Sequence, residues 1–162
     1  MKCAEPQKEH QFLHRMVGKW KITSTTSDAN YDPDDPEQCF TETVRSIGGL
    51  WIVGDSKGRM PDESPMTAVL TIGFDPAKGR FVGSWVGSMM TNMWVYTGWL
   101  EPDGKTLVLE AEGPKFDGSG DMALYRDVIT LHDDHHRTFA SSSRQPDGSF
   151  KEFMSSEFHR VE

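Results

Sequence analysis

The segment WVGSMMTNMWVY, residues 85–96, carries the densest group of side chains suited to holding a small apolar molecule. Flat aromatic rings and flexible, polarizable thioethers adapt to irregular apolar shapes. We expect Trp85, Met90, Met93 and Tyr96 to border a ligand cavity. Because successive strand residues face opposite sides, Met93 and Tyr96 cannot both point inward, so one of them is expected at the rim.

Arg126 is the residue expected to supply the charge of this cavity. In the sequence LYRDV it alternates with Leu124 and Val128, which predicts that all three face the interior. An inward guanidinium binds a ligand carboxylate through two parallel hydrogen bonds. The alternative is a filled core in which Arg126 pairs with Glu42 or Asp55.

Three glycines, Gly83, Gly87 and Gly98, accompany these aromatic residues. A glycine inside a strand often marks a bend or a place where another group approaches the backbone closely. The glycines therefore predict either the curvature of a barrel wall or space for a ligand.

The sequence shows no pattern that supports covalent or acid–base catalysis. Residues 84–88 cannot form a nucleophile elbow, because that motif needs a strand followed by a helix. Ser141–Ser143 has no obvious His–Asp partner, and Glu110 and Glu112 alternate with apolar residues, which predicts that they face solvent. We therefore expect no catalytic residues.

The run HDDHH at residues 132–136 contains side chains that bind Zn²⁺ or Ni²⁺. It coincides with a predicted hairpin turn, and a turn tip cannot direct all of these groups to one centre. We expect a solvated polar turn, no bound metal and no cofactor.

The elements that would position these residues are one helix and about ten strands. The helix is expected over residues 6–17, because Phe12, Leu13, Met16 and Val17 share one of its faces, and Gly18 is expected to end it. The expected strands are 19–26, 39–47, 50–59, 67–75, 80–88, 92–101, 106–113, 122–132, 137–143 and 150–160.

Strands joined mostly by tight turns predict an antiparallel meander. Closing such a sheet removes its exposed edges, so we predict an all-β, up-and-down antiparallel barrel capped at one end by the helix. The nine prolines fall in predicted turns or tails, as a hydrogen-bonded barrel requires. No linker divides residues 1–162, so a single domain is expected.

The order of helix, GKW and first strand resembles the entry to calycin barrels, the group of lipocalins and fatty-acid-binding proteins. The motifs GGLWIVGDSKG, TIGFDPAKGRFVGSWVGSM and GWLEPDGKTLVLEAEG and the closing FHR resemble an uncharacterised bacterial domain family grouped with these barrels. The resemblance implies the fold and no activity. In lipocalins an arginine of the last strand packs on the entry tryptophan, which implies a contact between Arg160 and Trp20 here.

Haem is the cofactor alternative. In size and strand count the chain resembles nitrobindins, ten-stranded haem barrels whose iron-binding histidine lies near the C-terminus, where this chain has His159. Strand alternation opposes this, because His159 faces outward if Phe158 and Arg160 face toward Trp20. We therefore expect no haem.

The net charge of −8 argues against binding of nucleic acid, because phosphate contacts need concentrated basic residues and these are scattered. No apolar run is long enough to span a membrane, and the N-terminus does not resemble a signal peptide. Two cysteines, Cys3 and Cys39, suggest a reducing compartment. We expect a cytoplasmic protein.

The favoured function is binding of a small apolar or amphipathic molecule inside the barrel, without catalysis. The first alternative is a barrel with a filled interior whose exposed Trp and Met residues meet a second copy, giving a homodimer or scaffold. The second is an enzymatic barrel in which Arg126 and a carboxylate act on a bound molecule. Neither nucleic acid nor a membrane is expected as a partner.

Overall fold

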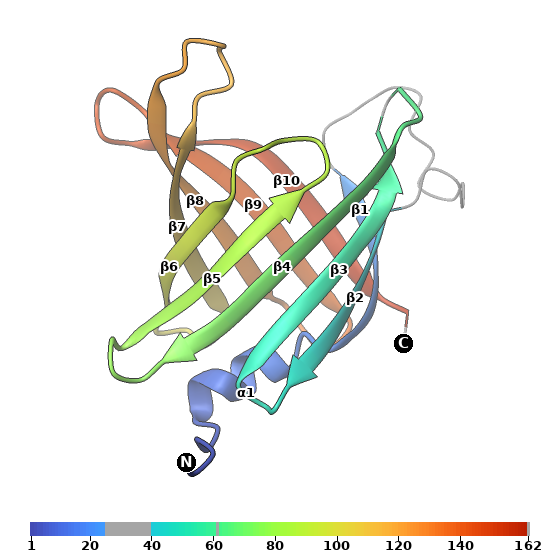
Figure 1. Cartoon of the computed structure of the whole chain (residues 1–162), viewed down its shortest axis with the longest axis vertical. Coiled ribbons are helices and arrows are strands. Elements are labelled where there is room, and N and C mark those ends of the chain that lie inside the picture. Colours follow the sequence, from blue (N-terminus) through green and yellow to red (C-terminus); the bar gives the residue numbers. More distant parts are fainter. Residues whose placement is uncertain (25–39, 61, 162) are drawn as a thin grey trace.

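The described residues of this computed structural model, 1–24, 40–60 and 62–161, form a closed barrel of ten antiparallel strands with one short helix, as predicted. Each strand pairs with the next, and β1 closes the barrel against β10 (Figure 1). In chain order the elements are α1 (Lys8–His14), β1 (Gly18–Ser24), β2 (Phe40–Ile47), β3 (Trp51–Arg59), β4 (Pro65–Asp75), β5 (Arg80–Gly87), β6 (Trp94–Leu100), β7 (Thr106–Pro114), β8 (Met122–Leu131), β9 (His136–Arg144) and β10 (Phe150–Arg160).

The two ends of the barrel differ. Helix α1 lies across one of them, where β2, β4, β6 and β8 end (Figure 1). We call this the helix end. The loops that follow β5, β7 and β9 lie at the opposite end, which we call the open end because no helix of the described residues covers it. No helix among these residues is long and apolar enough to cross a membrane.

Helix α1 is shorter than predicted but buries the predicted face. Phe12, Leu13 and Met16 are at most 5% exposed. The helix ends at His14 because the backbone N–H groups of Met16 and Val17 bond three residues back instead of four, which tightens the chain. We expected Gly18 to end the helix. Instead it begins β1, with a φ of +137°, a conformation that favours glycine.

Trp20 joins the helix to both ends of the chain. It is 1% exposed, and its Nε1 donates a hydrogen bond to the Met16 carbonyl at 2.8 Å. The Arg160 guanidinium lies 4.3 Å from the centre of the Trp20 ring, which is the contact expected from the sequence. Arg160 also donates to the carbonyl of Arg15 at 2.7 Å. First strand, last strand and helix therefore meet at one residue.

A second arginine, which the sequence analysis did not single out, lies inside the helix end. Arg137 of β9 forms a buried ion pair with Glu42 of β2, across the barrel interior. Its guanidinium also lies 4.7 Å from the Trp20 ring centre and 3.9 Å from that of Phe158. Burial lowers the pKa of Arg137, and the Glu42 carboxylate opposes that shift. Glu42 is thus paired with Arg137 and not with Arg126.

Apolar side chains fill the rest of the helix end. Inward and outward positions alternate along each strand, and several inward residues of this half are at most 2% exposed. They include Ile52, Ile72, Phe81, Leu107, Leu109, Ile129 and Leu131. These side chains therefore form the packed core of this half of the barrel.

Two of the nine prolines, which we expected only in turns or tails, lie in strands. Pro65 begins β4 and Pro114 ends β7, so these prolines are strand residues and not turn residues. Both lie at strand ends, where a missing N–H interrupts the ladder least. Of the two cysteines, Cys3 is exposed and unpaired in the described structure, and Cys39 lies outside the described residues.

Gly83 and Gly98 mark places where the backbone of the neighbouring strand approaches closely, and not ligand space. A Cβ atom at Gly83 would lie 2.1 Å from the carbonyl oxygen of Thr71, and one at Gly98 would lie 2.0 Å from that of Val108. The neighbouring strand therefore occupies the volume that a side chain would need. At Gly87 the same volume is taken by the Trp85 ring.

Replacing Trp20 with alanine should lower the free energy of unfolding by about 3–5 kcal/mol, because the change removes a fully buried ring and leaves a cavity. Urea denaturation followed by circular dichroism measures this loss. Trp51→Ala is the matched control, since Trp51 lies on the outside and is 39% exposed. Equal losses for the two variants would contradict the anchoring role of Trp20.

Candidate functional site

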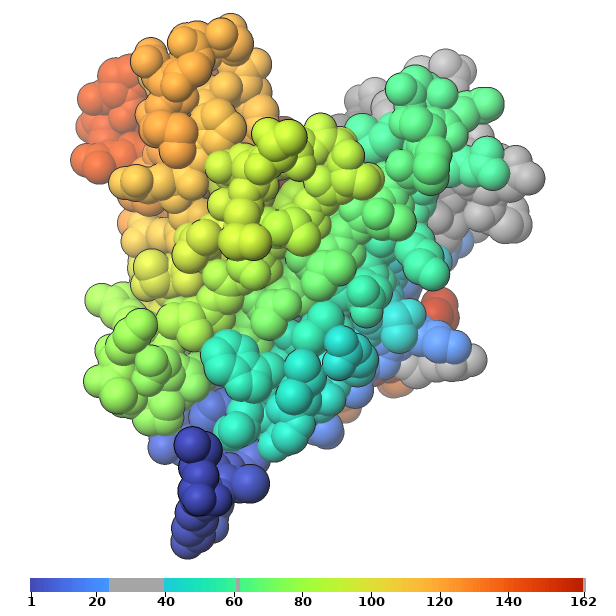
Figure 2. All heavy atoms as spheres, in the orientation of Figure 1, coloured from blue at the N-terminus to red at the C-terminus, as the bar shows by residue number. Residues whose placement is uncertain are grey.

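The open end of the barrel contains a pocket of about 520 Å³. It lies between the β7–β8 loop and the β9–β10 loop, which project together from this end (Figure 2). The residues that line it come from these loops and from the adjoining ends of β8, β9 and β10. They are Lys115, Phe116, Asp117, Ala123, Tyr125, Ser143, Arg144, Gln145, Pro146 and Phe153.

Aromatic rings form one side of this pocket. Tyr125, which is 4% exposed, packs edge-on against Trp94 with their ring centres 5.0 Å apart. The ring centres of Phe116 and Phe153 lie 5.7 Å and 6.0 Å from that of Tyr125. Unlike Tyr125, these two phenylalanines are 64% and 44% exposed. Large apolar side chains exposed together around a concave surface are typical of a binding site.

Phe153 reaches the pocket through a β-bulge in β10. The register with β9 shifts between Glu152 and Met154, so Phe153 is left out of the ladder. An extra residue of this kind reverses which side the following residues face and re-aims a side chain. The bulge therefore allows the open end of β10 to present an aromatic ring that strict alternation would not place there.

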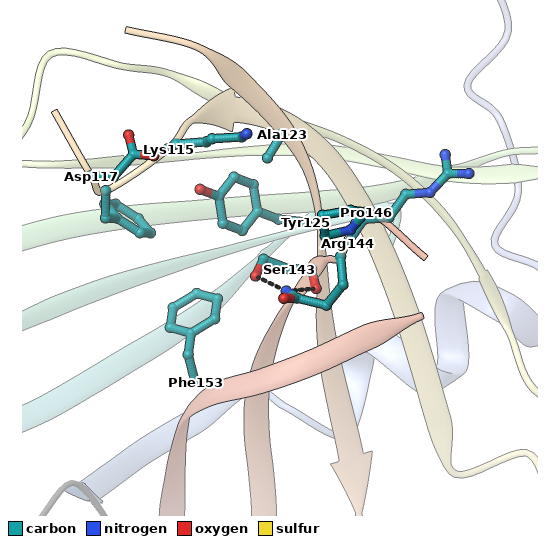
Figure 3. A pocket seen from close by; sticks show the side chains of 10 residues that line it. Lys115, Asp117, Ala123, Tyr125, Ser143, Arg144, Pro146 and Phe153 are labelled. Carbon is teal, nitrogen blue, oxygen red and sulfur yellow. Dashed lines mark hydrogen bonds between the residues drawn. The ribbon is translucent and has the colours of Figure 1, made fainter. Parts of the chain in front are cut away.

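Polar groups gather at the rim. The amide nitrogen of Gln145 donates to the carbonyl of Ser143 at 3.1 Å and to its hydroxyl at 3.2 Å (Figure 3). The Lys115 side chain extends toward Ala123, whereas the guanidinium of Arg144 points away from the rings (Figure 3). The charged residues that line the pocket are Lys115, Arg144 and Asp117. Because Arg144 points away, Lys115 is the cation available to an acidic group of a ligand, and the Asp117 carboxylate lies in the same lining.

A partly buried carboxyl lies deeper in the barrel than the pocket. Asp127 is the inward residue that follows Tyr125 on β8, and it accepts hydrogen bonds from the hydroxyls of Tyr96 and Ser141. Burial raises the pKa of Asp127. Burial and the Asp127 charge raise the pKa of Tyr96 as well. The sequence pattern did not reveal this group, because its members lie on three strands and because an inward Arg126 would have placed its neighbour Asp127 on the outside.

The aromatic and methionine residues expected at the cavity lie beside the pocket and do not line it. Tyr96 is 4% exposed and faces inward, and Trp85 and Met90 are partly buried against the core. Met93 is 57% exposed and directly precedes β6, so of these two residues only Tyr96 faces inward. Met90 supports the pocket indirectly. Its sulfur accepts a hydrogen bond from Nε1 of Trp94 at 3.0 Å, and the Trp94 ring packs against Tyr125.

The prediction that Arg126 faces the cavity is wrong. Its Nε donates to a carboxylate oxygen of Glu110 at 2.9 Å, and its guanidinium lies 3.9 Å from the Phe150 ring centre. Tyr125, Asp127 and every second residue of β8 in step with them face inward. Arg126 lies between these two and faces the outer wall. The apolar neighbours Leu124 and Val128 suggested the opposite phase, because partly buried apolar residues also occur on the outer wall.

Ser141 and Glu110, two of the serine and glutamate residues considered from the sequence, are engaged in local contacts. Ser141 donates to Asp127, but the structure places no histidine of the described residues in hydrogen-bond contact with either. Glu110 and Glu112 face outward as predicted, and Glu110 is occupied by Arg126.

His159 lies on the outer wall of β10, as alternation predicts, and its side chain is 51% exposed. It therefore does not face the barrel interior, where a haem would have to lie. Of the HDDHH residues, His136 is part of β9 and lies beside His159, while His132 and Asp133–His135 form the preceding turn.

Asp127→Asn should gain stability relative to wild type as the pH rises from about 3 to about 8. Burial raises the pKa of Asp127 in the folded state, so the folded state binds this proton more tightly than the unfolded chain. The stabilisation is complete below the ordinary carboxyl pKa of about 3.9 and is lost as the pH rises through the raised value. Urea denaturation of both proteins across this range measures the difference.

Asp103→Asn is the control of opposite sign. The backbone N–H of Lys105 and the hydroxyl of Thr106 hold the pKa of Asp103 below its ordinary value, so its contribution is lost as the pH falls. The Asp103 variant should therefore lose stability relative to wild type over the same rise in pH. A change in the same direction for both variants would contradict the assignment for Asp127.

No curated protein matches the chain. Among solved structures it is similar to a redesigned β-barrel at 11% identity and a TM-score of 0.46, over 98% of this chain and 100% of that one. It is also similar to mFAP1, a redesigned barrel bound to DFHBI, at 14% identity and a TM-score of 0.41, over 95% of this chain and 100% of that one. The model of the family DUF1579, described as a protein of unknown function, matches residues 5–160. The chain therefore belongs to the DUF1579 family.

Proposed function

We propose that the protein binds a small amphipathic molecule at the open end of the barrel, without catalysis. The observation that carries this proposal is the pocket itself, in which two exposed phenylalanines flank the buried Tyr125 ring. Its volume of about 520 Å³ falls within the range of about 300–1,000 Å³ found for small-molecule sites. A flat apolar group can stack on these rings and remove them from water.

The charges around the pocket determine which way such a ligand enters. The Asp127 carboxyl lies on the inner side and would repel an acidic group that entered first. Lys115 and the Ser143–Gln145 pair lie at the rim. The ligand therefore enters with its apolar end first and keeps its acidic or polar group at the rim, beside the Lys115 ammonium.

The packed half of the barrel limits the length of the ligand. Fully buried side chains fill the interior around Trp20 and Ile72, so the molecule occupies only the open half. This favours a short, flat molecule over a long acyl chain that would need the whole barrel length.

We also infer that the family is related to calycin barrels. The contact between Arg160 and Trp20, at 4.3 Å, supports this, because an arginine of the last strand packs on the entry tryptophan in lipocalins as well. The relation concerns the closure of the barrel and adds nothing about the ligand.

Titration with a fluorescent fatty-acid analogue of short chain length tests the proposal. We expect saturable binding of one molecule per chain, weakened by about fivefold or more in Phe153→Ala, because a lost aromatic stacking partner costs about 1 kcal/mol or more. Lys115→Gln should weaken binding of the acidic analogue and leave binding of its methyl ester unchanged.

Arg126→Ala is the matched control and should bind like wild type, because Arg126 lies on the outer wall. Absence of saturable binding to the wild type would overturn the proposal. So would equal weakening by Phe153→Ala and Arg126→Ala. If size-exclusion chromatography instead showed a dimer that Phe153→Ala dissociates, the exposed rings would be an interface between copies, and the oligomer alternative would replace this one.

A further inference from the structure

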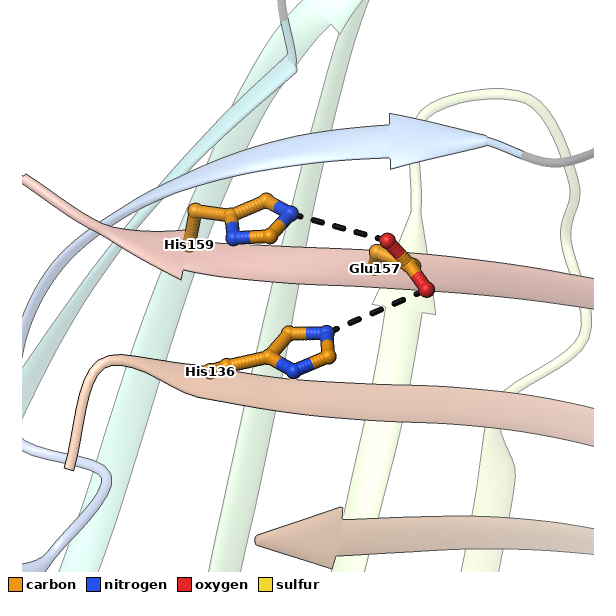
Figure 4. Close-up of side chains that lie close together, drawn as sticks. All are labelled: His136, Glu157 and His159. Atoms are coloured by element: carbon orange, nitrogen blue, oxygen red, sulfur yellow. Dashed lines mark ion pairs between the residues drawn. The ribbon is translucent and has the colours of Figure 1, made fainter. Parts of the chain in front are cut away.

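We propose that His136, Glu157 and His159 form a binding site for a divalent transition metal, Zn²⁺, on the outer wall of the barrel at its helix end. One ligand atom of each residue lies within 4.8 Å of the other two (Figure 4). The site is separate from the pocket, which lies at the opposite end, and does not rest on the proposed function.

Strand pairing brings the three side chains together. His136 and His159 are direct partners in the β9–β10 register. Glu157 precedes His159 by two residues and therefore shares its face of β10. Both imidazoles and the carboxylate point to the same side of the sheet (Figure 4). The ladder holds the backbone of all three residues, so only side-chain torsions remain free.

The present contacts leave the ligand atoms without good partners. Glu157 lies 3.8 Å from Nε2 of His136 and 3.6 Å from Nε2 of His159, and both distances exceed those of a hydrogen bond. Nε2 of His136 is buried and has no hydrogen-bond partner among the described residues. A polar atom of this kind is costly to bury, and a metal ion between the three side chains would satisfy it.

The donor set matches zinc chemistry. Two imidazoles and one carboxylate are the protein ligands of open zinc sites, in which water takes the fourth position. Zinc–nitrogen distances of about 2.0–2.1 Å in a tetrahedron separate neighbouring ligand atoms by about 3.3 Å. The two imidazole rings are parallel, with centres 4.9 Å apart, so they must tilt toward each other to share an ion.

Among the described residues, three side chains are placed to be ligands. His132 stacks on His136 with ring centres 4.8 Å apart, but its Nε2 lies 3.0 Å from the Thr138 hydroxyl and is engaged there. Lys21 is paired with His159 in the β1–β10 register and faces the same side, so it brings a positive charge to this face of the sheet. The carboxylate of Glu157 offsets this charge, and the net charge of −8 favours cations overall.

Isothermal titration with ZnCl₂ tests the site, using untagged protein in which Cys3 and Cys39 are replaced by serine so that thiols cannot bind the ion. We expect one Zn²⁺ per chain, with affinity reduced by about tenfold or more in Glu157→Gln and in His159→Asn. His135→Asn changes a histidine of the neighbouring turn and should leave the affinity unchanged. Zn²⁺ should raise the melting temperature of wild type and not that of Glu157→Gln.

Cobalt(II) provides an independent readout, because its visible absorption is stronger in a four-coordinate tetrahedral site than in the six-coordinate aqueous ion. The band should appear with wild type at one equivalent and be lost in His159→Asn. Absence of Zn²⁺ binding at one equivalent would overturn the proposal. Binding that survives both substitutions, or that falls equally in His135→Asn, would overturn it as well. Circular dichroism of each variant verifies that the barrel is folded.

Discussion

The contact of Trp20 with two arginines is the interaction on which the rest of the barrel depends. A closed sheet needs its first and last strands held in one register, and Arg160 of β10 lies directly against the indole of β1. Arg137 lies against the same ring and is itself neutralised by Glu42 of β2. A buried ion pair of this kind contributes little net stability, but leaving either charge alone would be strongly destabilising. It therefore fixes how β2 and β9 lie relative to each other across the interior more than it strengthens the fold.

The sequence predicted the fold well, because its evidence is local. Turn residues separate the strands at regular spacing, and the apolar face around Leu13 and Met16 identifies the helix. The site was predicted poorly, because it depends on the phase of each strand. Arg126 and Asp127 are neighbours, and the apolar residues beside Arg126 favoured the wrong phase, which exchanged an inward acid for an outward base. A one-residue error in phase reverses every side chain of a strand.

Contacts between distant segments could not be predicted from sequence patterns either, because those patterns describe only nearby residues. Glu42 and Arg137 are separated by 95 residues, and nothing in the chain near either one indicates the other. His136 was visible in the HDDHH run, but its partners lie on the next strand, so the run alone suggested only a polar turn. The bulge at Phe153 adds a further reversal that no period-two pattern contains.

The bulge in β10 has a consequence for how members of such a family can diverge. On its C-terminal side, Phe158 and Arg160 keep the phase that closure against Trp20 demands. On its N-terminal side the phase is set independently, because the extra residue absorbs the difference. Insertions, deletions and substitutions at the open end can therefore accumulate without disturbing the closure of the barrel. Selection can therefore change the open end of the barrel and preserve the helix end independently, although both depend on the same strand.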